Sequence, residues 1–302
     1  MFDLDDLLQK TSRTFALAIP LLPEPARNEV GVAYLLFRIA DTFEDATKWP
    51  RSQRMDVLER YVEVIESKRG AEKISELCAK SPPIDHDGYL ELLTKLPELF
   101  AELEKLSPTA REIVTRHAIR TTEGMSRVVA RADEAGNLRL ETKQDLKDYC
   151  YVVAGIVGEL LTELFVAGTP SLSSQQQALN ARMVAFGEGL QLVNILKDAA
   201  SDATEGRVYL PSKLTLADVF AMAREDLQLG DEYVRALQTG GAPRGYLAFC
   251  GIALVLAWRA LAVLEEQGAG KKVGRPDVMA LFEKLQHALD AGTPLDCRAL
   301  AS

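Results

Sequence analysis

The sequence predicts an all-α fold. Apolar residues recur every three or four positions through most of the 302 residues, while strict apolar-polar alternation rich in β-branched residues is hard to find. Hydrophobic residues make up 47% of the chain, which is enough to bury a large core. The breaks between helical stretches are short, and none has the composition of a domain linker. We therefore expect a single helical domain over residues 1–302.

The N-terminal half is expected to hold five helices, because helix-breaking residues separate five helical patterns. Pro23 and Pro25 precede the second helix, the segment SPPIDHDG (81–88) precedes the fourth, and Gly136 follows the fifth. These helices are expected over residues 4–17, 25–46, 52–67, 88–104 and 108–131.

The C-terminal half is expected to hold six helices. The first begins at Thr142, with Asp145 three residues later as a weaker form of the capping box, and it is apolar on nearly all sides. A helix without a polar face belongs in the middle of a bundle. GTPS (168–171) ends this helix, and GAGKKVGRP (268–276) precedes the last one. The six are expected over residues 142–167, 174–201, 215–227, 231–239, 243–266 and 276–290.

Composition and charge exclude several classes of protein. A net charge of −9 and a pI of about 5.1 argue against binding to nucleic acid, which calls for a basic face. The longest apolar run, Leu247 to Trp258, is 12 residues, whereas a membrane-spanning helix needs about 20. The N-terminal MFDLDDLLQK does not resemble a secretory signal, so a cytoplasmic location is expected. The four scattered cysteines are expected to be free thiols, and the three isolated histidines disfavour zinc.

Two of the predicted helices carry a polar stripe among apolar residues. One stripe has spacings of four, three and four residues and the other of three, four and four, which place each set of side chains on one helix face. A single Asp-xxx-Asp pair is usually a solvated helix face. Here Leu, Ile and Val flank both stripes, so we expect the carboxylates to point into the bundle, where unpaired charge is costly. The stripes consist of Tyr34, Arg38, Asp41 and Asp45, and of Gln191, Asn194, Asp198 and Asp202.

Carboxylates in such stripes require a cationic partner. Two of them about 4 Å apart repel by roughly 4 kcal/mol at an effective dielectric constant of 20. Oxygen ligands without His or Cys favour Mg²⁺ or Ca²⁺, and Mg²⁺ commonly completes its octahedron with waters and substrate phosphates. A diphosphate is therefore the natural substrate group. Arg38 and Arg207 could contact its oxygens, or could instead pair with a stripe aspartate.

Four blocks of sequence stand out in this order: SRTFALAIPLLP (12–23), DTFED (41–45), YCYVVAGIVGELL (149–161) and QLVNILKDAASDATEGRVYLP (191–211). In order and spacing they resemble the blocks of the squalene/phytoene synthase family, over most of the chain. The resemblance implies the isoprenoid synthase fold, a helical bundle around a central cavity. It also implies an enzyme that joins two prenyl diphosphates head to head through a cyclopropyl diphosphate. One departure is Ser201, which stands where the family commonly has an acid.

The resemblance implies roles for the residues that match these blocks. Asp41, Asp45, Asp198 and Asp202 would hold Mg²⁺ between two helices, where it neutralises the leaving diphosphate as the allylic C–O bond ionises. Tyr149 would lie near the reacting carbons, although a tyrosine at this position also suits a core. Contacts to diphosphate or metal are implied for Ser12, Arg13, Gln191 and Asn194.

Further residues suit the prenyl chains of such a substrate. Val153, Val157 and Leu161 follow Tyr149 every four residues and form either an apolar wall for a prenyl tail or an ordinary core stripe. The remaining candidates for ring contacts with the substrate, which could also simply pack, are Phe15, Tyr34 and Phe37.

The one concentrated basic loop carries Lys271, Lys272 and Arg275. In the family a late loop can reach diphosphate or the phosphate of a nicotinamide cofactor, and a solvated surface loop fits these residues equally well. NADPH is therefore an expected cofactor together with Mg²⁺.

The most specific expectation is a squalene synthase that joins two farnesyl diphosphates through presqualene diphosphate. DTFED and SRTFA resemble squalene synthases, whereas GRVYLP (206–211) is more typical of bacterial phytoene-type members. Dehydrosqualene, hydroxysqualene and phytoene therefore stay open as products made without NADPH. A non-catalytic assembly factor and an enzyme that ionises only one diphosphate are further alternatives. Peripheral contact with a membrane could serve product release.

Overall fold

The computed structural model describes residues 2–12, 14–46 and 48–302, and it confirms the all-α fold. The chain forms two compact units. The first comprises Met1–Ile19 and Glu24–Leu138, and the second comprises Pro20–Pro23 and Arg139–Ser302. The single domain expected from the sequence stays a prediction.

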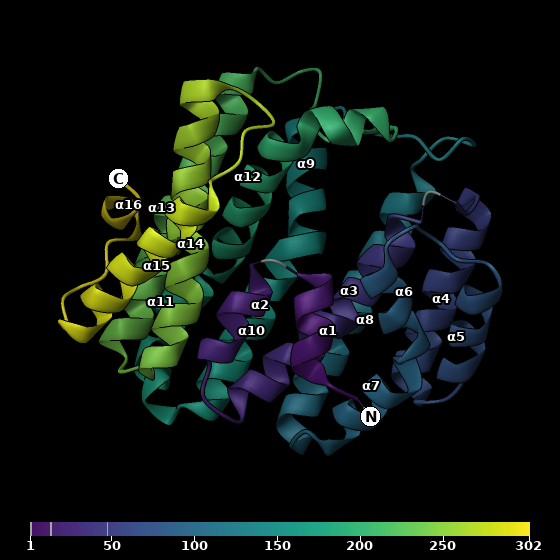
Figure 1. The fold of residues 1–302 in the computed structure, drawn as a ribbon, viewed down its shortest axis with the longest axis horizontal. Coiled ribbons are helices and arrows are strands. Elements are labelled where there is room, and N and C mark those ends of the chain that lie inside the picture. The colour runs from purple at the N-terminus through teal and green to yellow at the C-terminus, as the bar shows by residue number, and fades with distance from the viewer. Residues whose placement is uncertain (1, 13, 47) are drawn as a thin grey trace. The chain divides into compact units, whose positions relative to one another are not determined.

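The first unit is built around α3 (Figure 1). This helix packs against α1, α4, α6, α7 and α8, because its apolar face, with Leu35, Leu36, Ile39 and Phe43, is completely buried. The helices are α1 (Leu4–Thr11), α2 (Phe15–Ala18), α3 (Ala26–Glu44), α4 (Arg51–Ser67), α5 (Ala71–Lys80), α6 (Asp87–Thr94), α7 (Leu96–Lys105) and α8 (Pro108–Ala130), and the short 3-10 helix η1 (Ile19–Leu21) begins in this unit.

Three expectations for the first unit were wrong in detail. The helix expected over 4–17 ends at Thr11, and Ser12 Oγ then accepts the backbone N–H of Phe15 at 2.9 Å as α2 begins. The helix expected over 88–104 is two helices, because Pro97, near the start of α7, cannot continue the hydrogen bonds of α6. Helix α5 was not expected from the sequence, because its ten residues bury only Ala71, Ile74 and Cys78.

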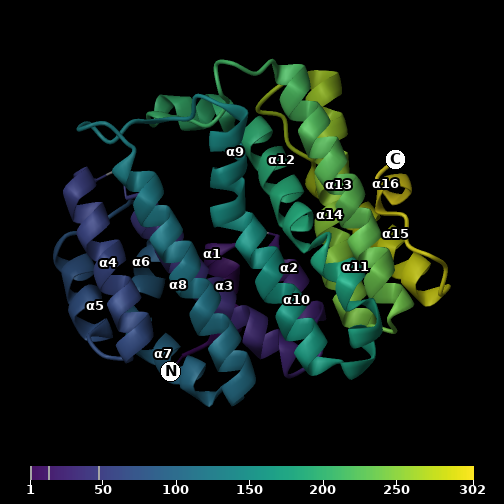
Figure 2. The same ribbon diagram turned by 180° about the vertical axis from the view of Figure 1, so that it is seen from behind.

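The second unit is built around α12, which packs against α10, α13 and α14. In Figures 1 and 2, α12 and α13 run side by side. The elements are β1 (Leu138–Arg139), α9 (Lys143–Cys150), the π-helical segment η2 (Tyr151–Gly155), α10 (Ile156–Gly168), the 3-10 helix η3 (Pro170–Gln175), α11 (Gln176–Asn180), α12 (Met183–Thr204), β2 (Arg207–Val208), α13 (Leu216–Thr239), α14 (Arg244–Gln267), α15 (Arg275–Asp290) and α16 (Cys297–Leu300).

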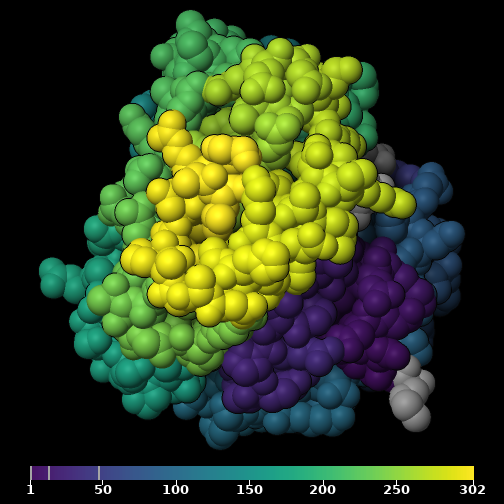
Figure 3. Space-filling view, turned by 60° about the vertical axis from the view of Figure 1, so that its left-hand side comes forward, coloured from purple at the N-terminus to yellow at the C-terminus, as the bar shows by residue number. Residues whose placement is uncertain are grey.

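Several features of the second unit match the sequence and several do not. The capping box of Thr142 and Asp145 is confirmed. The helices expected over 215–227 and 231–239 form one continuous helix, α13, in which Gly230 lies against the side chain of Leu254. Helix α16, which follows the last expected helix, was not expected because it has only four residues. Figure 3 shows α15 and α16 in yellow on the surface of this unit, where they pack on α14.

Glycines allow α12 to lie directly against its neighbours. A Cβ atom built on Gly158 would lie 1.8 Å from the carbonyl oxygen of Met183, and one built on Gly187 would lie 2.0 Å from that of Ala154. No side chain fits at either distance, so glycine is required for the backbones to approach this closely. These contacts fix α12, and with it the second aspartate stripe, against η2 and α10.

Two helical stretches are long and apolar enough to span a membrane. They are Lys143–Gly168 and Arg244–Gln267, and 50% and 78% of their most apolar windows are buried inside the protein. The core helices of soluble proteins share this length and composition.

All four cysteines are buried and unpaired, as the sequence predicts.

Candidate functional site

Three carboxylates gather where α3 ends in the first unit. One oxygen from each of Asp41, Glu44 and Asp45 lies within 4.8 Å of the others. The C-terminus of a helix carries partial negative charge, so three acids there repel the helix dipole as well as one another. An all-oxygen donor set of this kind fits a hard cation such as Mg²⁺. Glu44 is only 2% exposed, and the sequence analysis did not single it out although it belongs to DTFED.

Arg38 lies beside this acidic cluster. Its Nη1 pairs with Oδ2 of Asp41, and its Nε–H donates to the hydroxyl of Tyr34 at 3.3 Å. The Tyr34 hydroxyl in turn donates to the carbonyl of Thr11 at 2.9 Å. Burial lowers the pKa of Arg38, but Asp41, Tyr34 and Tyr89 together outweigh it and hold this pKa above its ordinary value. The predicted face of Tyr34, Arg38 and Asp41 is confirmed, with Arg38 paired to the aspartate.

The N-terminal block contacts the stripe on α3 through an aromatic pair. The ring of Phe15 lies 5.3 Å from that of Tyr34. Ser12 is half-buried between α1 and α2, and Arg13 lies outside the described residues. The substrate contacts of this block stay predictions.

The second aspartate stripe lies on α12. Burial raises the pKa of Asp202 and the charge of Asp198 raises it further, while Arg207, 3.9 Å away, lowers it. A carboxylate whose charge is disfavoured in this way fits the cationic partner that the sequence predicts. Arg207 also lies 2.6 Å from Glu205. Ser201, at the departure from the family pattern, donates its hydroxyl to the carbonyl of Asp198 at 2.8 Å.

The amide residues of this stripe have different surroundings. Asn194 is exposed and accepts a hydrogen bond from Lys197 Nζ at 2.8 Å. Lys197 Nζ also lies 3.3 Å from Asp198, so this lysine joins the amide to the aspartate. Gln191 is half-buried, one turn nearer to the start of α12.

Tyr149 and the predicted apolar wall lie on α9, η2 and α10. The ring of Tyr149 stacks on that of Tyr209 with centroids 4.5 Å apart. Val153 and Val157 are half-buried, and Leu161 is buried. The π-helical turn at η2 has more residues per turn than an α-helix, so Val153 stands at a different angle from Tyr149 than in the continuous α-helix that the sequence predicts. Such turns occur frequently at functional sites. The apolar wall for a prenyl tail stays a prediction.

The basic loop begins next to the second stripe. The backbone N–H of Gly270 donates to the carbonyl of Lys197 at 3.2 Å, which fixes the loop one residue from Asp198. Lys271, Lys272 and Arg275 follow and are exposed. The exposure of these side chains is compatible both with phosphate binding and with a solvated surface loop. The loop lies beside Asp198, one of the metal-binding candidates of α12.

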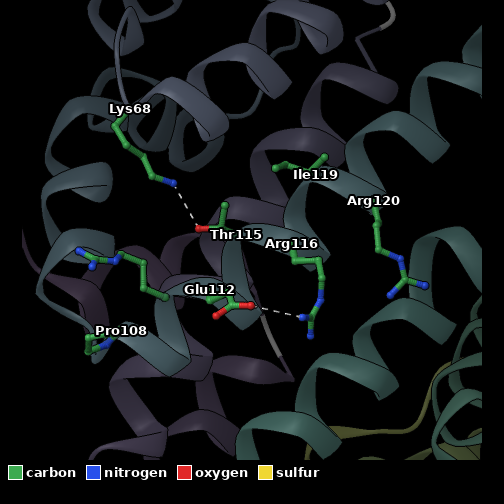
Figure 4. Close-up of a pocket in the computed structure, with 8 residues that line it drawn as sticks. Lys68, Pro108, Glu112, Thr115, Arg116, Ile119 and Arg120 are labelled. Carbon is green, nitrogen blue, oxygen red and sulfur yellow. Dashed lines mark hydrogen bonds and ion pairs between the residues drawn. The ribbon is translucent and has the colours of Figure 1, made fainter.

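A separate pocket of about 580 Å³ lies in the first unit at the end of α4 and along α8 (Figure 4). Lys68 Nζ points into it and donates to Thr115 Oγ1 at 3.2 Å, and Arg116 lies 3.9 Å from Glu112. Arg111 pairs with Glu104 at 2.8 Å. Lys68, Arg111 and Arg116 of this pocket thus contact neighbouring oxygens. None of the aspartates of either stripe lines the pocket.

Comparison with known proteins decides the family. The model of a family described as squalene/phytoene synthase matches residues 8–219. The chain belongs to the squalene/phytoene synthase family. The squalene synthase of Schizosaccharomyces pombe is 29% identical over 235 residues, which cover 77% of this chain and 48% of that protein. The squalene synthase of Saccharomyces cerevisiae is 29% identical over 286 residues, which cover 91% of this chain and 59% of that protein. The chain spans about half the length of the curated relatives it matches.

Solved structures share the fold of this squalene/phytoene synthase family member. The complex of TcSQS with the ligand E5700 has a TM-score of 0.73 at 22% identity and covers 96% of this chain and 88% of that one. A dehydrosqualene synthase in complex with a ligand has a TM-score of 0.56 at 19% identity and covers 95% of both chains. The chain therefore has the helical isoprenoid synthase fold, as the resemblance implied.

A pair of carboxyl groups on α12 and α13 gives this family member a pH-dependent stability. Burial, with the charge of Asp226, raises the pKa of Glu188 to about 7, and burial raises that of Asp226 to about 6. The folded state therefore binds more protons than the unfolded state between the ordinary glutamate pKa and pH 7, so stability falls as pH rises through this range. Glu188→Gln is expected to raise the melting temperature at pH 8 and to leave it unchanged at pH 4.

The exposed Glu266 on α14 provides the control for this prediction. Glu266→Gln is expected to leave the melting temperature unchanged at both pH values. Thermal unfolding followed by circular dichroism measures all three proteins. A gain from Glu188→Gln that is equally large at pH 4 would show that side-chain packing rather than ionisation causes it.

Proposed function

We propose that this protein condenses two farnesyl diphosphates head to head, through presqualene diphosphate, to squalene, with Mg²⁺ and NADPH as cofactors. The observation that carries the proposal is the acidic cluster of Asp41, Glu44 and Asp45 with Arg38 beside it, in a chain of the squalene/phytoene synthase family. The cytoplasmic location and a peripheral membrane contact for release of an apolar product are part of the same proposal.

Ionisation of the allylic C–O bond requires charge stabilisation on the leaving diphosphate. Mg²⁺ supplies this as a Lewis acid when it is bound. Asp41 and Asp45 would hold it on α3, and Asp198 and Asp202 on α12. Arg38 remains charged at neutral pH, and its N–H donors would bind oxygens of the leaving diphosphate.

Apolar and aromatic side chains are proposed to bind the prenyl chains and to stabilise the carbocation. The half-buried Val153 and Val157 offer surface to a prenyl tail and keep water from the cation. Tyr149 and Tyr209, stacked at 4.5 Å, offer a ring face to positive charge and a hydroxyl for proton removal. Serine and arginine at positions 12 and 13 would bind the diphosphate from the N-terminal block.

The last step distinguishes squalene from the other products of the family. Hydride from NADPH gives squalene, while proton loss or water gives dehydrosqualene or hydroxysqualene. Lys271, Lys272 and Arg275 are proposed to bind the phosphate of NADPH, because Gly270 anchors their loop next to Asp198. Dehydrosqualene is the second candidate, supported by the GRVYLP segment at 206–211.

Omission of NADPH is the test of this proposal. With Mg²⁺ and farnesyl diphosphate, we expect squalene when NADPH is present and accumulated presqualene diphosphate when it is absent, as measured by mass spectrometry of the products. Lys271→Ala combined with Lys272→Ala should raise the NADPH concentration that is required without affecting the first condensation. Dehydrosqualene or hydroxysqualene formed at saturating NADPH would reassign the protein to a reductant-independent branch.

A further inference from the structure

Arg38 is held on several sides within the first unit. Its Nε–H donates to Tyr34, and its Nη1 pairs with Asp41. The ring of Tyr89, which comes from α6, lies 5.2 Å from the central carbon of the guanidinium, and that of Tyr34 lies 5.6 Å from it. Within the described part of the chain, these contacts use two of the five N–H donors of the guanidinium, so three are left for the oxygens of a ligand.

Tyr89 has a fixed position because α6 is closely packed. A Cβ atom on Gly88 would lie 2.5 Å from the carbonyl oxygen of Lys10, so α6 rests directly on the backbone of α1. Lys10 Nζ lies 2.9 Å from Glu91 Oε2, one turn further along α6. The ring of His86 stacks on Tyr89 with centroids 4.0 Å apart, and His86 Nδ1 accepts the backbone N–H of Tyr89 at 3.3 Å. The ring is therefore presented to Arg38 by a rigid support.

We infer that Tyr89 is a positioning residue whose ring holds the Arg38 guanidinium so that its remaining N–H donors bind the diphosphate of the substrate. The inference rests on the proposed function, which identifies this anion as a prenyl diphosphate. A guanidinium is attracted to the face of an aromatic ring, and this contact leaves its in-plane N–H donors available.

The other partners of Arg38 do not replace this ring. A divalent cation held by the acidic cluster would engage the carboxylate of Asp41, which is also the partner of Arg38 Nη1. The contacts with Tyr34 and Tyr89 do not depend on that carboxylate, so they still orient Arg38 when Asp41 is engaged. Tyr34 lies on the same helix as Arg38, whereas Tyr89 fixes the guanidinium against a second helix.

Replacement of Tyr89 separates the ring from its hydroxyl. Leucine removes the aromatic face, and phenylalanine keeps it. We expect Tyr89→Leu to weaken binding of inorganic pyrophosphate in the presence of Mg²⁺ by about five- to tenfold, and Tyr89→Phe to stay within about twofold of wild type. Isothermal titration calorimetry on the full chain measures both. In steady-state assays with farnesyl diphosphate, Tyr89→Leu should raise KM more than it lowers kcat.

Glu76→Gln is the control, because it removes a carboxylate in an exposed pair with Lys80 on α5 and leaves α6 and the ring unchanged. This control should leave pyrophosphate affinity unchanged. If Tyr89→Leu lowers the melting temperature, Tyr89→Met, which also lacks the ring, is the second variant and should weaken pyrophosphate binding to the same extent. Equal pyrophosphate affinity of Tyr89→Leu and wild type overturns the inference, as does an equal loss in Tyr89→Phe. Weakened pyrophosphate binding in a protein that does not convert farnesyl diphosphate leaves the role of Tyr89 standing and rejects the proposed function. Absence of pyrophosphate binding by the wild type overturns both.

Discussion

Asp41→Asn and Asp198→Asn are each expected to lower turnover by about 100- to 1000-fold, because each removes a carboxylate that is proposed to bind the metal in the ionisation step. Both proteins should fold. Asp41 pairs with Arg38 at a partly exposed position, with side chains 32% and 24% exposed, so the loss of this pair has little effect on stability. Steady-state turnover of farnesyl diphosphate at limiting and saturating Mg²⁺ measures the effect.

Asp56→Asn is the control for these variants. Asp56 lies on α4 in an exposed pair with Arg60 and belongs to neither stripe. Its replacement should leave turnover at the wild-type level. Near-normal turnover of Asp41→Asn or Asp198→Asn at limiting Mg²⁺ would show that the stripe is structural and would remove that residue from the metal site.

Gly187→Ala is expected to destabilise the protein by about 3 kcal/mol, the upper end of the usual cost of overpacking, because the added Cβ meets backbone. The Cβ atom would lie 2.0 Å from the carbonyl oxygen of Ala154, so α12 and η2 must separate. In a protein of this size such a loss lowers the melting temperature by roughly 5 °C or more. Because α12 carries Asp198 and Asp202, turnover should fall as well.

Gly274→Ala is the matched control for this change. A Cβ atom on Gly274 has no neighbour closer than 3.7 Å, and its backbone φ of −68° suits alanine. The melting temperature of this variant should therefore equal that of the wild type in differential scanning calorimetry. A Gly187→Ala protein with unchanged melting temperature would show that the two backbones are less closely packed than described.

Helical periodicity in the sequence predicted which side chains share a face of the same helix. The face of Tyr34, Arg38 and Asp41 is confirmed because residues three and four apart on a helix are neighbours whatever surrounds them. The capping box at Thr142 is confirmed for the same reason, since it is formed by residues three positions apart.

Contacts between segments far apart in the sequence could not be predicted from helical periodicity. Tyr89 reaches Arg38 only because Gly88 lets α6 rest on α1, and no spacing in the sequence links these residues. The π-helical turn at Tyr151–Gly155, which packs against α12, was not expected, because apolar periodicity does not distinguish it from a continuous α-helix. Glu44 was missed because the stripe was continued from Asp41 by four residues to Asp45, although Glu44, three residues after Asp41, also lies near that face.

Head-to-head coupling itself is tested most directly by incubating the purified protein with farnesyl diphosphate, Mg²⁺ and NADPH and determining the mass of the products. The account predicts a thirty-carbon hydrocarbon with the mass of squalene, formed only when Mg²⁺ is present. Fifteen-carbon alcohols or cyclic hydrocarbons as the sole products would show that one diphosphate is ionised without coupling. That result, or the absence of any conversion, would contradict the proposed reaction.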